Sequence, residues 1–107
     1  MTVRRMTAAG IGLALAASLT PGPAVAAGNK VSIGDNFFQP KRITINAGER
    51  VKWTNNGDET HTTTSKTGLW DKTVPPGETA GKKFRKEGTY RYLCTIHDDM
   101  RGRVIVV

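Results

Sequence analysis

Residues 88–107 read GTYRYLCTIHDDMRGRVIVV and contain the single cysteine of the chain, Cys94. Before the cysteine, aromatic residues alternate with Arg91, and after it valines alternate with Arg103 and Ile105. Apolar residues at every second position predict β-strands on both sides of the cysteine. The loop between these strands is short and is held at both ends, so its side chains are expected to converge on one point.

The same period of two recurs in short segments earlier in the chain. These segments are Val31 with Ile33, Ile43 with Ile45, Val51 with Trp53, and a run centred on Phe84. Turn-forming residues separate them roughly every ten positions, as in an antiparallel sandwich or barrel. No stretch after residue 28 has the 3.6-residue apolar period of a helix, so the sequence predicts an all-β fold.

Residues 1–27 differ in composition from the rest of the chain. Arg4 and Arg5 precede a nearly apolar run, and Ala24-Val25-Ala26 offers small residues to a signal peptidase. This three-part pattern predicts a secretory signal peptide cleaved near Ala26 or Ala27, by the Sec or the twin-arginine route. The apolar run is short for a membrane span, although a retained N-terminal anchor is the alternative. We therefore expect a domain at residues 28–107 that is exported to the periplasm or the exterior, without stable membrane insertion.

The chain has 107 residues, with 16 Lys plus Arg, 9 Asp plus Glu and a formal net charge of +7. A domain of this size is marginally stable alone, and a single cysteine provides no internal disulfide, so a bound metal is one way to stabilise it. The basic residues at 82–86 are interpreted as a solvated face, with steering toward an acidic redox partner as the alternative. Nucleic acid is not an expected partner, because no stacking aromatic residues accompany the charges.

Cys94, His97 and Met100 share one short loop, and His61 follows a turn at residues 55–58. Loops at one end of a sandwich cluster, so His61 is able to meet the other three. Thiolate and thioether sulfur favour Cu(I), while imidazole suits Cu(II), and a His, His, Cys site with a weak axial Met is the blue-copper electron-transfer site.

Cysteine and histidine have other uses in proteins. Structural zinc prefers more thiolates and no methionine. A Cys/His nucleophile pair lacks a visible third orienting group and an oxyanion hole, so we do not expect an enzyme. A purely structural role for each residue remains the simplest alternative.

The motifs resemble those of a small cupredoxin, most of all the amicyanin and plastocyanin group. The segment FFQPKRITINAGERVKWTN is similar to the paired strands of that family, and GTYRYLCTIHDDMRGRVIVV is similar to its C-terminal signature. The resemblance implies an eight-stranded Greek-key β-sandwich that holds one type 1 copper ion. His61, Cys94 and His97 would be equatorial ligands and Met100 the axial one.

The resemblance also implies a monomeric electron carrier that serves a redox donor and a redox acceptor. His97 would lie at the solvent edge, and His61 would be more buried, with its second ring nitrogen held by a partner that the sequence does not identify. A copper-binding or copper-delivery protein without an electron-transfer role is the alternative function.

Two features depart from the family pattern. Amicyanins have Thr-Pro between the cysteine and the second histidine, where this chain has Thr95-Ile96, so an N–H is present that could donate to the Cys94 sulfur. Asp98 and Asp99 place carboxylates where family members usually present an apolar patch, which leaves the identity of the partner open.

Overall fold

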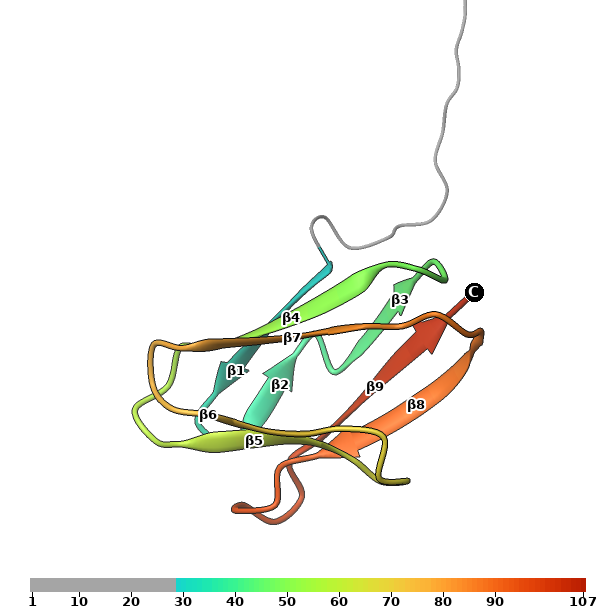
Figure 1. Ribbon diagram of the computed structural model, residues 1–107. Helices are drawn as coiled ribbons and strands as arrows, with labels where there is room; N and C mark the ends of the chain where they lie inside the picture. The colour runs from blue at the N-terminus through green and yellow to red at the C-terminus, as the bar shows by residue number, and fades with distance from the viewer. Residues whose placement is uncertain (1–28) are drawn as a thin grey trace, which may run out of the picture.

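The structure is a computed structural model that describes residues 29–107, so the predicted signal peptide lies outside the described residues. Nine β-strands form two facing sheets, as Figure 1 shows, and the described part of the chain contains no α-helix. The four-stranded sheet has the order β2 (Phe37–Gln39), β1 (Lys30–Gly34), β4 (Arg50–Asn55), β7 (Thr79–Lys83). The five-stranded sheet has the order β3 (Arg42–Ile45), β9 (Arg101–Val106), β8 (Gly88–Leu93), β5 (His61–Ser65), β6 (Asp71–Val74).

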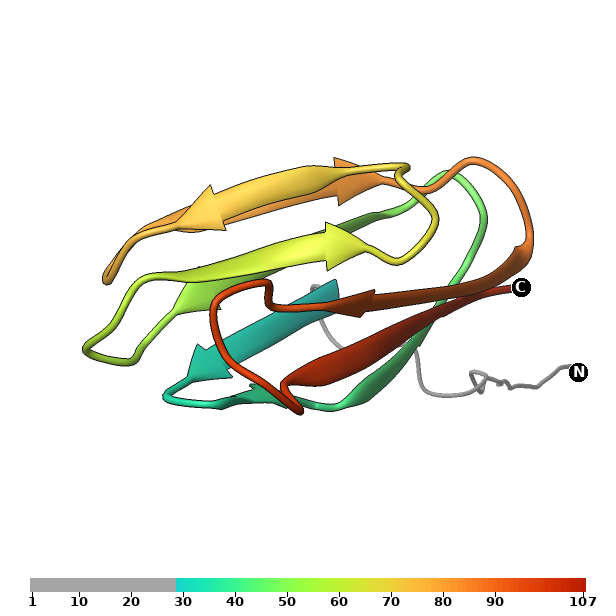
Figure 2. The same cartoon turned by 90° about the horizontal axis from the view of Figure 1, so that it is seen from below.

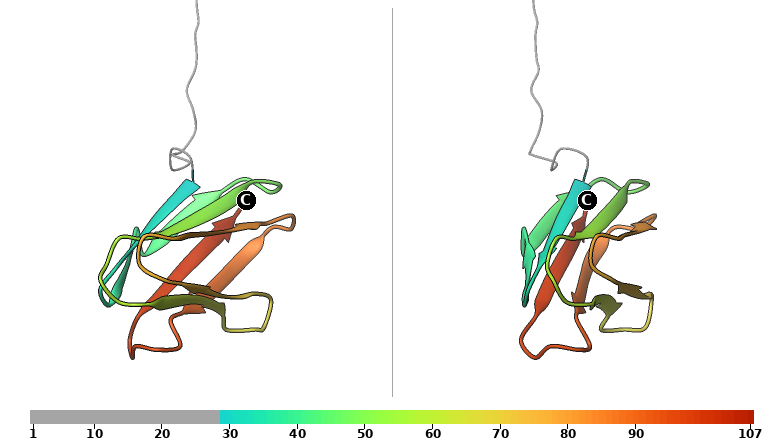
Figure 3. Two further views of the ribbon diagram at one scale, coloured as in Figure 1. Left: turned by 60° about the vertical axis from the view of Figure 1, so that its left-hand side comes forward. Right: turned by 90° about the vertical axis from the view of Figure 1, so that its left-hand side faces the viewer.

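The chain crosses repeatedly between the two sheets, which produces the Greek-key arrangement. Strand β1 pairs in parallel with β4, and β3 pairs in parallel with β9, whereas the other pairings are antiparallel. Figures 2 and 3 show the two layers from other directions. The turn β1–β2 and the loops β4–β5 and β8–β9 gather at the end of the sandwich away from the C-terminus (Figures 1 and 2).

Alternate residues of the strands fill the space between the sheets. Trp53 of β4 contacts Trp70 and Tyr92, with ring centroids 5.9 Å and 5.4 Å away. Phe38 packs edge-on against Tyr92 from the other side, at 4.7 Å. These rings and the buried valines and isoleucines around them form a close-packed core below the loop end of the sandwich.

The all-β sandwich expected from the sequence is confirmed, with differences in detail. The resemblance implied eight strands, but residues 37–45 form two separate strands, β2 and β3, that belong to different sheets. The run predicted around Phe84 is a strand that ends one residue earlier, at Lys83, and Phe84 itself is buried just beyond it. Strands β5 and β6 were not predicted, because both are runs of mainly polar residues without alternating apolar ones.

Candidate metal centre

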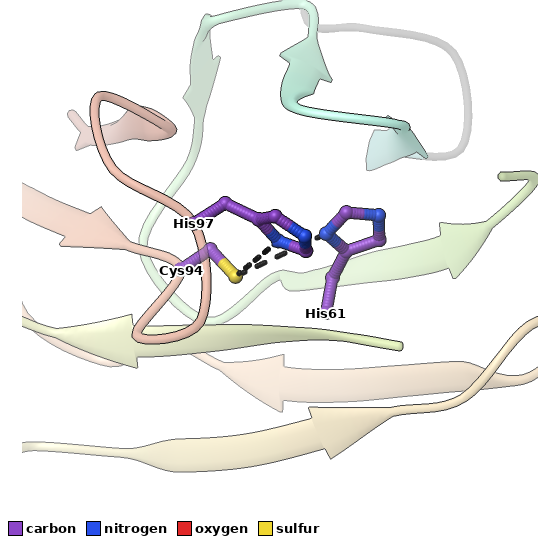
Figure 4. A group of neighbouring side chains, drawn as sticks. All are labelled: His61, Cys94 and His97. Carbon is purple, nitrogen blue, oxygen red and sulfur yellow. Dashed lines mark hydrogen bonds between the residues drawn. The ribbon is translucent and has the colours of Figure 1, made fainter. Parts of the chain in front are cut away.

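Three elements bring the predicted donor residues together at the loop end of the sandwich. His61 is the first residue of β5, and Cys94 directly follows β8. His97 lies in residues 94–100, here called the ligand loop, and Met100 ends that loop immediately before β9. Figure 4 shows both imidazoles turned toward the Cys94 sulfur.

The donor atoms are spaced to share one ion. The Cys94 Sγ lies 3.9 Å from His61 Nδ1 and 3.7 Å from His97 Nδ1. All three donor atoms lie within 4.8 Å of one another. An ion about 2.0 Å from each nitrogen and about 2.3 Å from sulfur in a trigonal plane would separate nitrogen from sulfur by about 3.7 Å. The two sulfur–nitrogen distances therefore fit a single first-row metal ion.

Burial divides the donors as the resemblance implied. His61 is 0% exposed and Cys94 4%, whereas the His97 side chain is 22% exposed. One imidazole is thus sealed inside the protein, and the other reaches solvent at the edge of the site.

Met100 is 1% exposed and is fixed next to the cysteine by the backbone. The Cys94 amide donates to the Met100 carbonyl over 2.9 Å, which closes the ligand loop at its base. The loop turns at Asp99, whose φ of 63° lies in the left-handed region that Asp tolerates better than most residues. The closure places the backbone of Met100 next to Cys94, at the position where the resemblance implies an axial ligand.

Two backbone amides donate to the Cys94 sulfur, those of Thr62 and Ile96, each at 3.4 Å. The Ile96 contact is the one that the sequence suggested. The Thr95 amide in turn donates to the Thr62 hydroxyl over 2.9 Å, which ties β5 to the ligand loop. Burial raises the pKa of the Cys94 thiol, but the bonds from Thr62, His97, Ile96 and His61 outweigh it and lower the pKa from 9.0 to about 6. The site therefore favours the thiolate that binds metal.

Each imidazole makes a second contact, to a carboxylate, through its outer nitrogen. His61 Nε2 lies 3.2 Å from Asp35 Oδ1, and His97 Nε2 lies 2.8 Å from Glu59 Oε1. In metal sites such carboxylates fix the ring orientation and make the imidazole a more basic ligand. Neither carboxylate contact was predicted from the sequence.

Asp35 is itself held in place from several directions. It accepts hydrogen bonds from the amides of Asp58, at 3.0 Å, and of Glu59, at 3.3 Å. These two bonds and the one to His61 hold the pKa of Asp35 below 3.8, and the Asp58 amide has the largest effect. Gly57 leaves room for the carboxylate, since a Cβ there would lie 2.2 Å from Asp35 Oδ1. The β1–β2 turn of one sheet thereby positions a donor of the other.

Comparisons with known proteins identify the family of the chain. Residues 7–106 match the family model of the cupredoxin-like domain. The chain belongs to the cupredoxin family. It is 34% identical over 89 residues to amicyanin-alpha of Methylorubrum extorquens, covering 78% of this chain and 75% of that one. It is 35% identical over 87 residues to plastocyanin of Scenedesmus fuscus, covering 68% and 89%.

Among solved structures, a purple cupredoxin from Nitrosopumilus maritimus superposes with a TM-score of 0.67 at 26% identity, covering 73% of this chain and 98% of that one. The fold is thus shared with a cupredoxin of known structure.

The loop end of this cupredoxin is acidic. Five of the 9 acidic residues of the chain lie in the turn and loops around the donors: Asp35, Asp58, Glu59, Asp98 and Asp99. One exposed apolar side chain, Ile96 at 54%, stands among them in the ligand loop. The ligand loop that carries His97 therefore combines two carboxylates with one exposed large apolar side chain. Within residues 29–107, no helix has the length and apolar character to cross a membrane.

Proposed function

We propose that this cupredoxin is a blue, type 1 copper protein that carries single electrons between exported redox partners. The observation that carries the proposal is the convergence of His61, His97 and the Cys94 thiol within reach of one ion, with the buried Met100 joined to Cys94 by a backbone hydrogen bond. Two imidazoles, one thiolate and a thioether are the donor set of a type 1 site. Copper bound there would supply a one-electron couple between Cu(I) and Cu(II).

The protein's part in this function is to keep the donors still. The thiolate is held by two amides, each imidazole by a carboxylate, and the ligand loop by a backbone bond at its base. A site whose ligands cannot relax changes little between oxidation states, which favours fast electron exchange. The partly exposed ring of His97 is the edge through which an external partner comes nearest to the donors.

A nucleophilic role for Cys94 is the competing interpretation, because Cys94, His61 and Asp35 follow the order of a catalytic triad. The sulfur, however, is only 4% exposed, and a second imidazole is equally close to it. The neighbouring amides of Thr62 and Ile96 point at the sulfur itself rather than at a space where a substrate oxyanion would lie. These contacts favour metal binding, and we propose no enzymatic activity.

The deciding experiment is the visible spectrum of the mature chain, residues 28–107, after one equivalent of Cu(II) is added. We expect an intense blue thiolate-to-copper band in the unaltered protein. Reduction should abolish this band and reoxidation should restore it. The Cys94→Ser variant should lack the band. A pale complex that passes its copper to an apo acceptor but does not cycle would instead indicate copper delivery. A colourless complex would rule out the type 1 site.

The proposed cellular location is inferred from the signal-peptide pattern of residues 1–27. The protein would work as an exported monomer in the periplasm or outside the cell, and its donor and acceptor would be redox proteins. Amino-terminal sequencing of the exported protein would identify the cleavage site.

A further inference from the structure

The outer face of the five-stranded sheet carries a row of cations that the metal centre does not use. Arg103 of β9 stands opposite Arg91 of β8 on one side and Arg42 of β3 on the other. Lys66, just beyond β5, extends the row through its backbone bond to Arg91, at 3.0 Å. These four residues are here called the basic row.

The basic row lines a groove of about 600 Å³ on this face. Lys41 and Arg101 complete the charged lining, and no acidic residue contributes to it. Six cations therefore face one groove.

This arrangement opposes folding. Like charges placed directly opposite one another on neighbouring strands are destabilising. In residues 29–107, the ion pairs are those of His61 with Asp35 and of His97 with Glu59, so no lysine or arginine of this region is paired with a carboxylate. Residues 1–28 contain no Asp or Glu that might neutralise the row. The structure thus leaves the row without a counter-charge from its own chain.

We infer that the basic row is a docking surface for an acidic segment of a partner protein. Four adjacent strands about 4.8 Å apart spread the row over about 14 Å, which suits a succession of carboxylates better than one small anion. Charge complementarity of this kind selects partners and speeds their encounter.

Other polyanions fit the groove less well. Insertion into an anionic membrane needs apolar side chains beside the charges, but the exposed large apolar residues of the described region all lie elsewhere: Phe37, Leu69, Ile96 and Val107. Single-stranded nucleic acid needs exposed aromatic rings, and the only aromatic residue of the lining, Tyr92, is 0% exposed.

The row lies close to the metal centre without covering it. Arg91 is three residues before Cys94, about 10 Å along the strand, and His97 does not line the groove. A partner docked on the row would leave the exposed edge of His97 free. That the partner is a redox protein rests on the proposed function, whereas binding of an acidic segment does not.

The test measures binding of poly-L-glutamate to the mature chain by calorimetry, with and without added copper. The variant is Arg91→Gln/Arg103→Gln. The matched control is Lys83→Gln/Arg85→Gln, which removes the same charge from a different groove. We expect about tenfold weaker binding for the row variant, from two lost surface charge interactions, and less than about twofold for the control. The row variant should also melt at a higher temperature at low salt, because repulsion across the strands is relieved.

Equal losses in both variants would overturn the proposal, since they would show only a response to net charge. It would also be overturned if inorganic phosphate or phosphatidylglycerol vesicles bound with the same dependence on the row while poly-L-glutamate did not. If the row binds poly-L-glutamate but Cu(II) gives no blue band, the docking surface stands and the proposed function fails.

Discussion

Asp35 contacts the outer nitrogen of the buried imidazole, although it lies 26 positions before His61 in the chain. An ionised carboxylate on the outer nitrogen makes the inner nitrogen a stronger donor and stabilises Cu(II) relative to Cu(I). In Asp35→Asn the side-chain oxygen still accepts hydrogen bonds, but the charge is gone. We expect Cu(II) affinity to fall about 10- to 100-fold and the reduction potential to rise.

Cyclic voltammetry and competition with a chelator would measure these two effects. Glu87→Gln, which removes an equal charge from the loop before β8, is the control and should leave both values unchanged. An unaltered potential in Asp35→Asn would show that the contact is only structural.

Cys94 gives the copper-free protein a pH signature. The folded pKa of about 6 lies below the ordinary 9.0, so the folded state releases its proton at lower pH than the unfolded state. The resulting stability is lost as the pH falls from about 9 toward 6, and it is absent below that window. Thiolate ultraviolet absorbance should therefore titrate near pH 6, and urea unfolding should show stability rising above that pH. Cys94→Ser should flatten this rise, and a thiol midpoint near 9 would contradict the prediction.

The convergence of His61, Cys94 and His97 was predictable because these residue types are rare in this chain and their chemistry is specific. Asp35 and Glu59 were not, because carboxylates in turns already have an ordinary explanation as solvated polar residues. Their contacts become visible only in the folded chain, where the β1–β2 turn meets His61 and the β4–β5 loop meets His97. Sequence spacing carries no signal of such contacts.

At the scale of elements, the ligand loop has an amide at Ile96, where the resemblance to amicyanins implies a proline. Ile96 donates to the thiolate over 3.4 Å, which withdraws charge from the sulfur and favours Cu(I). Ile96→Pro removes this donor, so we expect the reduction potential to fall. Ile96→Ala keeps the N–H while removing the exposed side chain, and it should leave the potential unchanged. A rise in the proline variant would refute the role of the amide.

Strand β9 depends on Gly102, which lies against the ring of its cross-strand neighbour. A Cβ at this position would lie 2.4 Å from Tyr92 Cζ, and the Tyr92 ring is 0% exposed and packed on all sides. Gly102→Ala should therefore destabilise the fold by about 1–3 kcal/mol, as overpacking does. Gly81→Ala is the matched control, because the nearest atom there, 3.0 Å away, is the end of the flexible Arg50 side chain. Urea unfolding measures both, and equal losses would contradict the prediction.

Elements with alternating apolar residues were predictable, and β5 shows why others were not. Thr62 and Thr63 are neighbours and both are buried, because each hydroxyl has a polar partner inside the protein. Thr63 accepts a hydrogen bond from Trp70 Nε1 at 3.0 Å, and Thr62 accepts one from the ligand loop. Polar residues with hydrogen-bond partners therefore occupy buried positions of this strand. The alternation of apolar residues on which strand prediction depends is absent there.

At the scale of the whole molecule, charge is separated between the acidic loop end and the basic face of the five-stranded sheet. Residues 29–107 hold all 9 acidic residues and 14 of the 16 basic ones, since Arg4 and Arg5 account for the other two, so their net charge is +5. If the net charge governed the rate of electron exchange, an anionic oxidant would react faster at low salt. If the local field at His97 governs that rate, a cationic oxidant reacts faster at low salt instead.

We expect the local field to decide, because Asp98 and Asp99 adjoin the exposed histidine and exposed charges act mainly within a Debye length of about 8–10 Å. Oxidation by a cationic cobalt(III) complex should quicken as salt is lowered, and oxidation by hexacyanoferrate(III) should slow. Asp98→Asn/Asp99→Asn should remove both trends, changing the low-salt rates by up to about tenfold. Asn tolerates the left-handed backbone of residue 99, so the loop keeps its shape. Stopped-flow rates over a series of salt concentrations give the sign directly, and a faster anionic oxidant at low salt would mean that the sheet's cations dominate the field at the copper edge.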